Sequence, residues 1–116
     1  MKKIVDRRMN QHLSDFLKSS TDQWAIEFRV HATRRMFSRR IGNKDVRNLL
    51  SKGTVIEEYQ DDLPFPSVLV NGFSNDNRPL HAVIGIDAKS FRLFVITIYQ
   101  PDPKRWTDNF TKRVPS

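Results

Sequence analysis

The chain of 116 residues has a length typical of a single domain, and its 20 lysines and arginines outnumber its 13 acidic residues, which gives a formal net charge of +7. The absence of cysteine excludes disulfide bonds and thiolate metal sites. We expect a soluble, cytoplasmic protein, because no apolar run is long enough to span a bilayer and the first lysines are not followed by the apolar stretch of a signal peptide.

The positive charge is concentrated in the first half of the chain. Residues 1–53 contain 13 lysines and arginines against five acidic residues, residues 57–62 are acidic, and residues 104–113 are basic again. This distribution indicates a polyanionic partner, which is a nucleic acid, an acidic protein or an anionic lipid. The alternative is a chain that is merely basic.

Helical periodicity comes first along the chain. Residues 9–19 predict a short amphipathic helix, since Leu13, Phe16 and Leu17 recur at i, i+3 and i+4. Residues 24–30 then alternate apolar and polar side chains, which fits either a short strand or the lead into the next helix.

Two further helices are predicted before the sequence changes from helical to strand-like periodicity. The first spans residues 31–40 and ends near Gly42, where a left-handed residue is favoured. The second spans residues 44–51, with Asn43 as its N-cap and Gly53 after its last turn.

Extended segments make up the second half. Strands are predicted at residues 54–59, 67–73, 80–86 and 91–99. The last contains LFVITIY, an apolar run typical of a central strand covered on both faces. The connections are too short for crossover helices, so neighbouring strands should be antiparallel.

These elements predict an α+β fold in which two or three N-terminal helices precede a four-stranded, mainly antiparallel, twisted sheet. We assign residues 1–23 to an N-terminal extension with one short helix and residues 24–116 to a single α+β domain.

The predicted helix at residues 31–40 carries the densest group of candidate functional side chains. At 100° per residue His31, Arg35 and Arg39 form one stripe, whereas Phe37 and Ile41 fall on a sector suited to packing. Guanidinium groups bind phosphate through two parallel hydrogen bonds and keep their charge, so this stripe suits a phosphate. The alternative is a solvated face whose arginines pair with the acidic residues at 57–62.

Two more candidates lie in the predicted strands. His81 shares a strand face with Gly85, which leaves space for a ligand or another backbone; the ordinary explanation is a core histidine bonded to the backbone. Tyr99 ends the last strand, where its phenol can donate a proton or hold a phosphate oxygen, or simply close the core.

Several common site types have no support in the sequence. The histidines lack the spacing of metal ligands, the glycines are isolated rather than grouped in a phosphate loop, and no serine lies in a nucleophile motif. We therefore expect neither a metal nor a cofactor.

The fragments HATRRMFSRRI, RPLHAVIGID and VITIYQPDPKRWTDNFTKR, in this order and spacing, resemble the bacterial and archaeal family known as domain of unknown function 4258. The resemblance covers about residues 26–113. It implies similarity to the RelE and MqsR toxins of toxin–antitoxin pairs, hence a RelE-like fold of the BECR type, metal-independent RNA cleavage, and a protein antitoxin, in this family often with a zinc-finger motif.

Together these observations lead to the hypothesis of a metal-free endoribonuclease. The expected catalytic residues are His31, His81, Tyr99 and Arg35, with one histidine as the base and the other histidine or the phenol as the acid. The expected RNA-binding residues are Arg34, Arg35, Arg39, Arg40, Lys104 and Arg105. The alternative is a non-catalytic basic module that binds RNA or an acidic protein partner.

Overall fold

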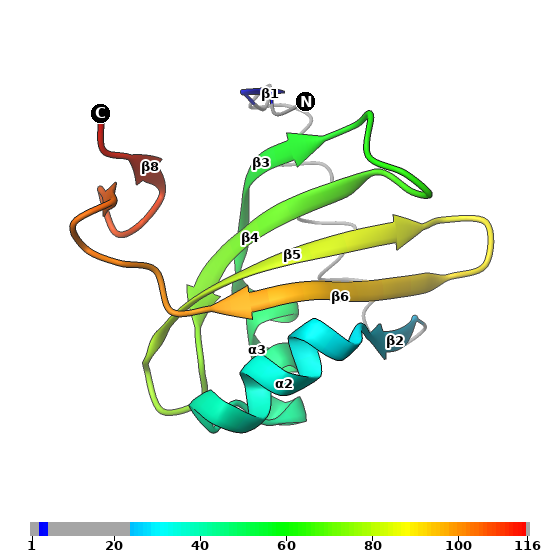
Figure 1. The fold of residues 1–116 in the computed structure, drawn as a ribbon, viewed down its shortest axis with the longest axis horizontal. Coiled ribbons are helices and arrows are strands. Elements are labelled where there is room, and N and C mark those ends of the chain that lie inside the picture. The colour runs from blue at the N-terminus through cyan, green and yellow to red at the C-terminus, as the bar shows by residue number, and fades with distance from the viewer. Residues whose placement is uncertain (1–2, 5–23, 116) are drawn as a thin grey trace.

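The computed structural model describes residues 3–4 and 24–115 of the chain. Within these ranges it forms an α+β domain with two helices, α2 (Val30–Arg39) and α3 (Asn43–Lys52), and one large sheet (Figure 1). The predicted helix at residues 9–19 lies outside the described residues.

Four strands follow the helices and form an antiparallel meander, as the alternating segments predict. They are β3 (Thr54–Tyr59), β4 (Ser67–Phe73), β5 (Pro79–Asp87) and β6 (Arg92–Tyr99). The meander is not the whole sheet, because β1 (Lys3–Ile4) pairs with β3 and β2 (Ala25–Phe28) pairs with β6, giving the order β1-β3-β4-β5-β6-β2.

Strand β2 makes the predicted sheet wrong in two respects. It precedes the helices, so the fold does not begin with helices alone, and it runs parallel to β6, so the sheet is mixed rather than mainly a four-stranded antiparallel one. Ile26 and Phe28 are partly buried against the core, which explains the apolar alternation seen in the sequence. The partner of this strand lies some 65 residues away and cannot be read from a local pattern.

The helix ends differ from the prediction by a few residues. The left-handed residue that closes α2 is Arg40, with φ of 55°, whereas Gly42 lies before α3 and donates its backbone N–H to Asp45 Oδ2 at 2.8 Å. Arg78, just before β5, donates to the carbonyl oxygens of Arg39 and Arg40 at 2.6 and 2.8 Å. A cation at a helix C-terminus is favourable, and this one fixes the end of α2 beside the sheet.

The hydrophobic core lies between the two helices and one face of the sheet. α3 contributes Val46, Leu49 and Leu50, and α2 contributes Ala32 and Met36. The strands contribute Val55, Val68, Val70, Leu80, Ala82, Ile84, Leu93, Val95 and Ile98. Because side chains alternate along a strand, the residues between these positions point to the opposite face, where no described helix lies.

That opposite face meets the C-terminal hairpin, by which we mean β7 (Trp106–Thr107), β8 (Lys112–Arg113) and the turn between them. These two strands form a small sheet of their own (Figure 1). The hairpin contacts the large sheet through side chains, and these contacts build the candidate site.

α3 and the sheet approach each other closely at Gly53, where a side chain would displace its neighbours. A Cβ added at Gly53 would lie 2.3 Å from the Leu49 carbonyl oxygen and 2.7 Å from Val70 Cγ1.

Gly53→Ala should therefore lower the free energy of unfolding by about 1–3 kcal/mol in urea denaturation. Gly42→Ala is the matched control, since its nearest neighbour would be Asp45 Oδ2 at 3.9 Å, and it should change stability by no more than about 1 kcal/mol. Equal losses in the two variants would contradict this packing argument.

Candidate functional site

A row of polar side chains crosses three neighbouring strands. Tyr99 on β6 pairs with His81 on β5, and His81 pairs with Asn71 on β4. The flanking residues Leu80 and Ala82 belong to the core under the helices, so these three side chains lie on the face that meets the C-terminal hairpin.

His81 is the centre of this row and is completely buried, with 0% of its surface exposed. Its Nε2 lies 2.8 Å from the backbone oxygen of Phe110, and its Nδ1 lies 3.1 Å from the Tyr99 hydroxyl. A carbonyl oxygen can only accept, so Nε2 carries the proton and donates it, while the Tyr99 hydroxyl donates to Nδ1. The ring also packs edge-on against Trp106, with centroids 4.4 Å apart.

The burial of this pair keeps both members neutral. Burial lowers the pKa of His81, although the hydrogen bond to the Phe110 carbonyl acts in the opposite direction. Burial likewise raises the pKa of the Tyr99 phenol. The resting state is thus a neutral imidazole beside a neutral phenol, with both ring nitrogens engaged.

Tyr99 is half-buried and borders an open hollow of about 380 Å³. The hollow is lined by Tyr99, Asp102, Arg105, Trp106 and Arg113. It therefore brings together a phenol, a carboxylate, an indole and two guanidinium groups, from the end of β6, the loop that follows it and the hairpin.

Arg113 is held in place by two neighbours. Its guanidinium donates to both carboxylate oxygens of Glu57, at 3.0 and 3.2 Å, and lies 4.6 Å above the Trp106 ring. Glu57 also accepts a 2.5 Å hydrogen bond from the Tyr59 hydroxyl. A guanidinium has five N–H groups, so the two bonds to Glu57 leave donors for a phosphate.

The hairpin turn above His81 has unusual backbone geometry. Asp108, Asn109 and Phe110 all have positive φ, of 59°, 58° and 66°. Asn71 Nδ2 donates to the backbone oxygen of Asn109 at 3.1 Å, next to the hydrogen bond from His81 to the backbone oxygen of Phe110. Left-handed backbone is tolerated by Asp and Asn but costs about 1–2 kcal/mol for other residues with a Cβ, so the bond from His81 to Phe110 stabilises the least favourable residue of the turn.

The family model described as Domain of unknown function (DUF4258) matches residues 28–100. The chain belongs to this family. No curated protein and no solved structure matches it. The DUF4258 match contains His81 and Tyr99 and ends just before Asp102, so most of the hollow is built by residues beyond the matched stretch.

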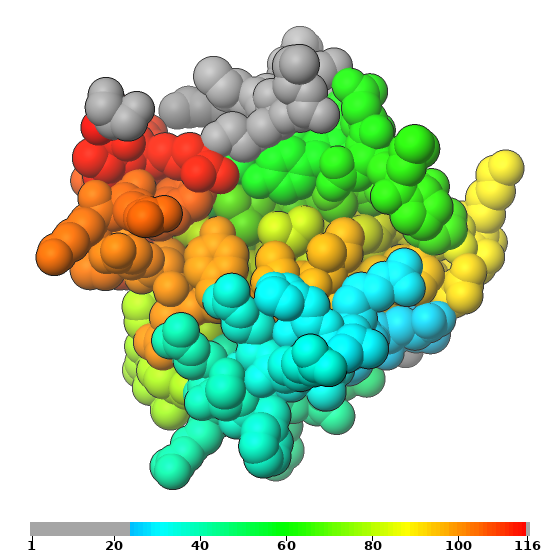
Figure 2. All heavy atoms as spheres, viewed as in Figure 1, coloured from blue at the N-terminus to red at the C-terminus, as the bar shows by residue number. Residues whose placement is uncertain are grey.

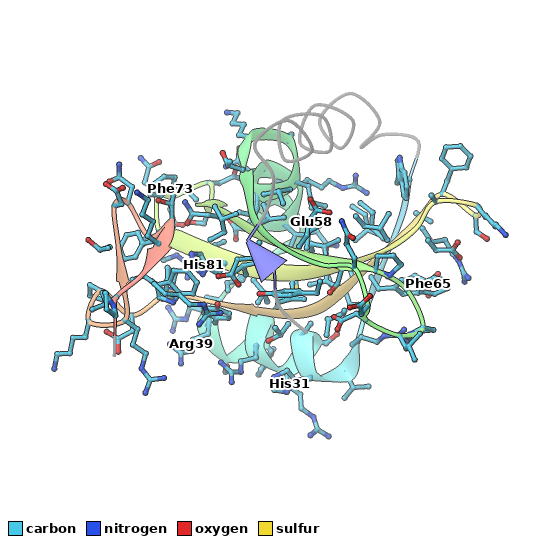
Figure 3. The ribbon with its side chains drawn as sticks, turned by 90° about the horizontal axis from the view of Figure 1, so that it is seen from above. His31, Arg39, Glu58, Phe65, Phe73 and His81 are labelled. Atoms are coloured by element: carbon cyan, nitrogen blue, oxygen red, sulfur yellow. The ribbon has the colours of Figure 1, made fainter. Side chains whose placement is uncertain are left out.

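The structure brings together part of the site predicted for this DUF4258 chain. His81 and Tyr99 touch, and Arg105 lies across the same hollow, whereas His31 and Arg35 are not among its lining residues. His31 is exposed on the outer side of α2, well apart from His81 (Figure 3).

The arginines in and at the end of α2 face solvent and do not pair with the acidic residues at 57–62. Arg34, Arg39 and Arg40 are exposed and Arg35 is half-buried. Among the described residues none of these four arginines forms an ion pair, and Glu57 is paired with Arg113. Phe37, which the helical pattern assigned to packing, is 89% exposed.

The sequence did not single out Asn71, Glu57 or Arg113. A useful signal existed for Asn71, because an amide in the strand SVLVNGF interrupts an apolar run. Glu57 and Arg113 are 56 residues apart, and their pairing follows only from the position of the hairpin. In the described ranges no three histidine, aspartate or glutamate side chains form a group suited to a metal ion, and no helix there is long and apolar enough to cross a membrane.

The buried His81 predicts a pH dependence of stability. Its folded pKa lies below the ordinary value of 6.5, so the unfolded chain takes up the proton first as the pH falls. The free energy of unfolding should therefore decrease below pH 6.5, by at most about 1.4 kcal/mol per pH unit from this group.

Urea denaturation at pH 7.5 and pH 5.5 measures this effect. His81→Gln should lose this part of the decrease, whereas His31→Gln, which alters an exposed side chain, should keep it. The same decrease in the wild type and in His81→Gln would show that another group causes it.

Proposed function

We propose that this protein is a toxin-like endoribonuclease that cleaves RNA by attack of the ribose 2′-OH, using side chains and no metal ion. The observation that supports it most is the hollow, in which a phenol backed by a neutral imidazole faces two guanidinium groups. A protein antitoxin of the zinc-finger type expected from the family resemblance is the regulatory partner in this proposal.

The base in this reaction is His81 acting through Tyr99. The Tyr99 oxygen takes the proton of the 2′-OH while its own proton passes to His81 Nδ1, 3.1 Å away. The Phe110 carbonyl stabilises the imidazolium that forms, because it accepts the hydrogen bond from Nε2 at 2.8 Å. The 2′ oxygen attacks the phosphorus, the 5′ oxygen leaves with a proton from water, and His81 returns its proton through Tyr99 to the solvent.

The charge that grows on the phosphoryl oxygens is stabilised by Arg105 and Arg113, which line the same hollow. This replaces the phosphate clamp expected from Arg35 and Arg39. The arginines of α2, together with Lys104, bind the rest of the RNA strand through its phosphates.

A second candidate has one specific observation in its favour. Both nitrogens of His81 are engaged and the ring is buried, which is the geometry of a structural histidine. The protein would then be a basic module that binds RNA without cutting it.

Removing the phenol hydroxyl tests the nuclease. Tyr99→Phe breaks the proton path, so the rate of RNA cleavage should fall by about 10²–10⁴-fold while the fold is retained. Tyr59→Phe is the comparison variant: it removes the hydroxyl of the other tyrosine, which bonds to Glu57 beside Arg113 and not to His81, so it should reduce cleavage far less than Tyr99→Phe does.

The assay uses purified protein, a labelled single-stranded RNA and excess EDTA, with DNA of the same sequence alongside. The proposal predicts RNA products ending in a 2′,3′-cyclic phosphate and intact DNA, because DNA lacks the 2′-OH. RNA that is bound but never cut by the wild type would support the binding module, and equal cutting by Tyr99→Phe would refute the role of the phenol.

A further inference from the structure

The outer face of α2 carries a feature that the catalytic hollow does not use. Phe37 is 89% exposed, more than the other exposed phenylalanines Phe73 and Phe91 at 46% and 49%, on a helix whose inner residues Ala32 and Met36 are buried. On the helix surface Arg34, three residues before Phe37, is its neighbour, and Arg40 follows at the left-handed residue that ends α2. The aromatic ring therefore has one guanidinium group beside it on the helix and a second residue of this type at the helix end.

These guanidinium groups are available for a partner. No acidic residue occurs in α2, whose sequence is VHATRRMFSR, and within the described residues Arg34 and Arg40 have no ion-pair partner. Other arginines of the fold are paired, as Arg78, Arg92 and Arg113 show. The charge on this face is left uncompensated, and its complement is a polyanion.

α2 packs on the opposite face of the large sheet from the C-terminal hairpin, but both can be seen from one side of the molecule. In Figure 2 the helix and the C-terminal segment are both visible on one surface, with atoms of β6 between them. The contact of Arg78 with the last carbonyl oxygens of α2 fixes the helix end in this position.

We propose that Phe37, with Arg34 beside it on α2 and Arg40 at the helix end, is a stacking platform for a base of single-stranded RNA, whose adjoining phosphates bind the two arginines. A base in a duplex has no free face, whereas an unpaired base can stack on an exposed aromatic ring. This inference rests on the proposed function and names its substrate class as single-stranded RNA.

The test measures, by fluorescence anisotropy, how tightly the full chain binds a labelled single-stranded oligonucleotide. Every nucleotide of this probe is 2′-deoxy, so it cannot be cleaved. The same probe in duplex form is measured alongside. Phe37→Ala should weaken single-strand binding by about tenfold or more and leave duplex binding unchanged. Phe37→Trp should restore it, because an indole also offers a flat ring. Val30→Ala is the matched control, since Val30 is a 68% exposed aliphatic residue on the same helix that cannot stack, and it should bind as the wild type does.

Salt dependence separates stacking from charge. Arg34→Gln and Arg40→Gln should each reduce the slope of log K against log salt by about one, whereas Phe37→Ala should leave the slope unchanged. Circular dichroism melting verifies that each variant is folded. Because the substituted side chains are exposed, we expect every variant to fold.

The outcomes also separate this inference from the nuclease. Wild-type affinity of Phe37→Ala for the single strand, or an equal loss in Val30→Ala, would overturn the platform even if RNA is still cleaved at the hollow. If the wild type binds a polyglutamate peptide and no oligonucleotide, the face is a protein-binding surface and the platform is wrong. In cleavage assays the platform predicts that Phe37→Ala raises KM rather than lowering kcat.

Discussion

The hydrogen bond between His81 Nε2 and the Phe110 carbonyl oxygen determines the rest of the site. It joins the large sheet to the C-terminal hairpin, and because the carbonyl cannot donate, it fixes which ring nitrogen carries the proton. The other nitrogen must then accept, and the hydroxyl within reach is that of Tyr99. One backbone oxygen thus orients the imidazole and the phenol together.

The hairpin is an unusual structure to place over a buried histidine. Three consecutive residues, Asp108, Asn109 and Phe110, adopt left-handed backbone, and two of their carbonyl oxygens accept hydrogen bonds from Asn71 and His81. Such strain persists when surrounding contacts enforce it, and it occurs most often at functional positions. The polar row on the sheet and the turn are therefore joined by the hydrogen bonds from Asn71 and His81 to the backbone oxygens of Asn109 and Phe110.

The sequence predicts those parts of the fold that depend on local periodicity. The α+β class, the helices α2 and α3 and the four strands of the meander follow from spacing and turn residues. The parallel pairing of β2 with β6 is non-local and was missed, as was the exposure of Phe37, because a helical wheel places residues on sectors without saying which sector meets the sheet. Strand alternation did place His81 on one strand face with Gly85, but only the position of the hairpin could show that Phe110 and Tyr99 would engage its two nitrogens.

The tautomer of His81 is the most direct test of this account. In ¹⁵N-labelled protein at pH 7, the imidazole shifts should show a neutral ring with the proton on Nε2 and an unprotonated Nδ1 that is hydrogen-bonded to Tyr99. A ring protonated on Nδ1, or a cationic ring at that pH, would contradict the account, because neither can accept a hydrogen bond from the phenol.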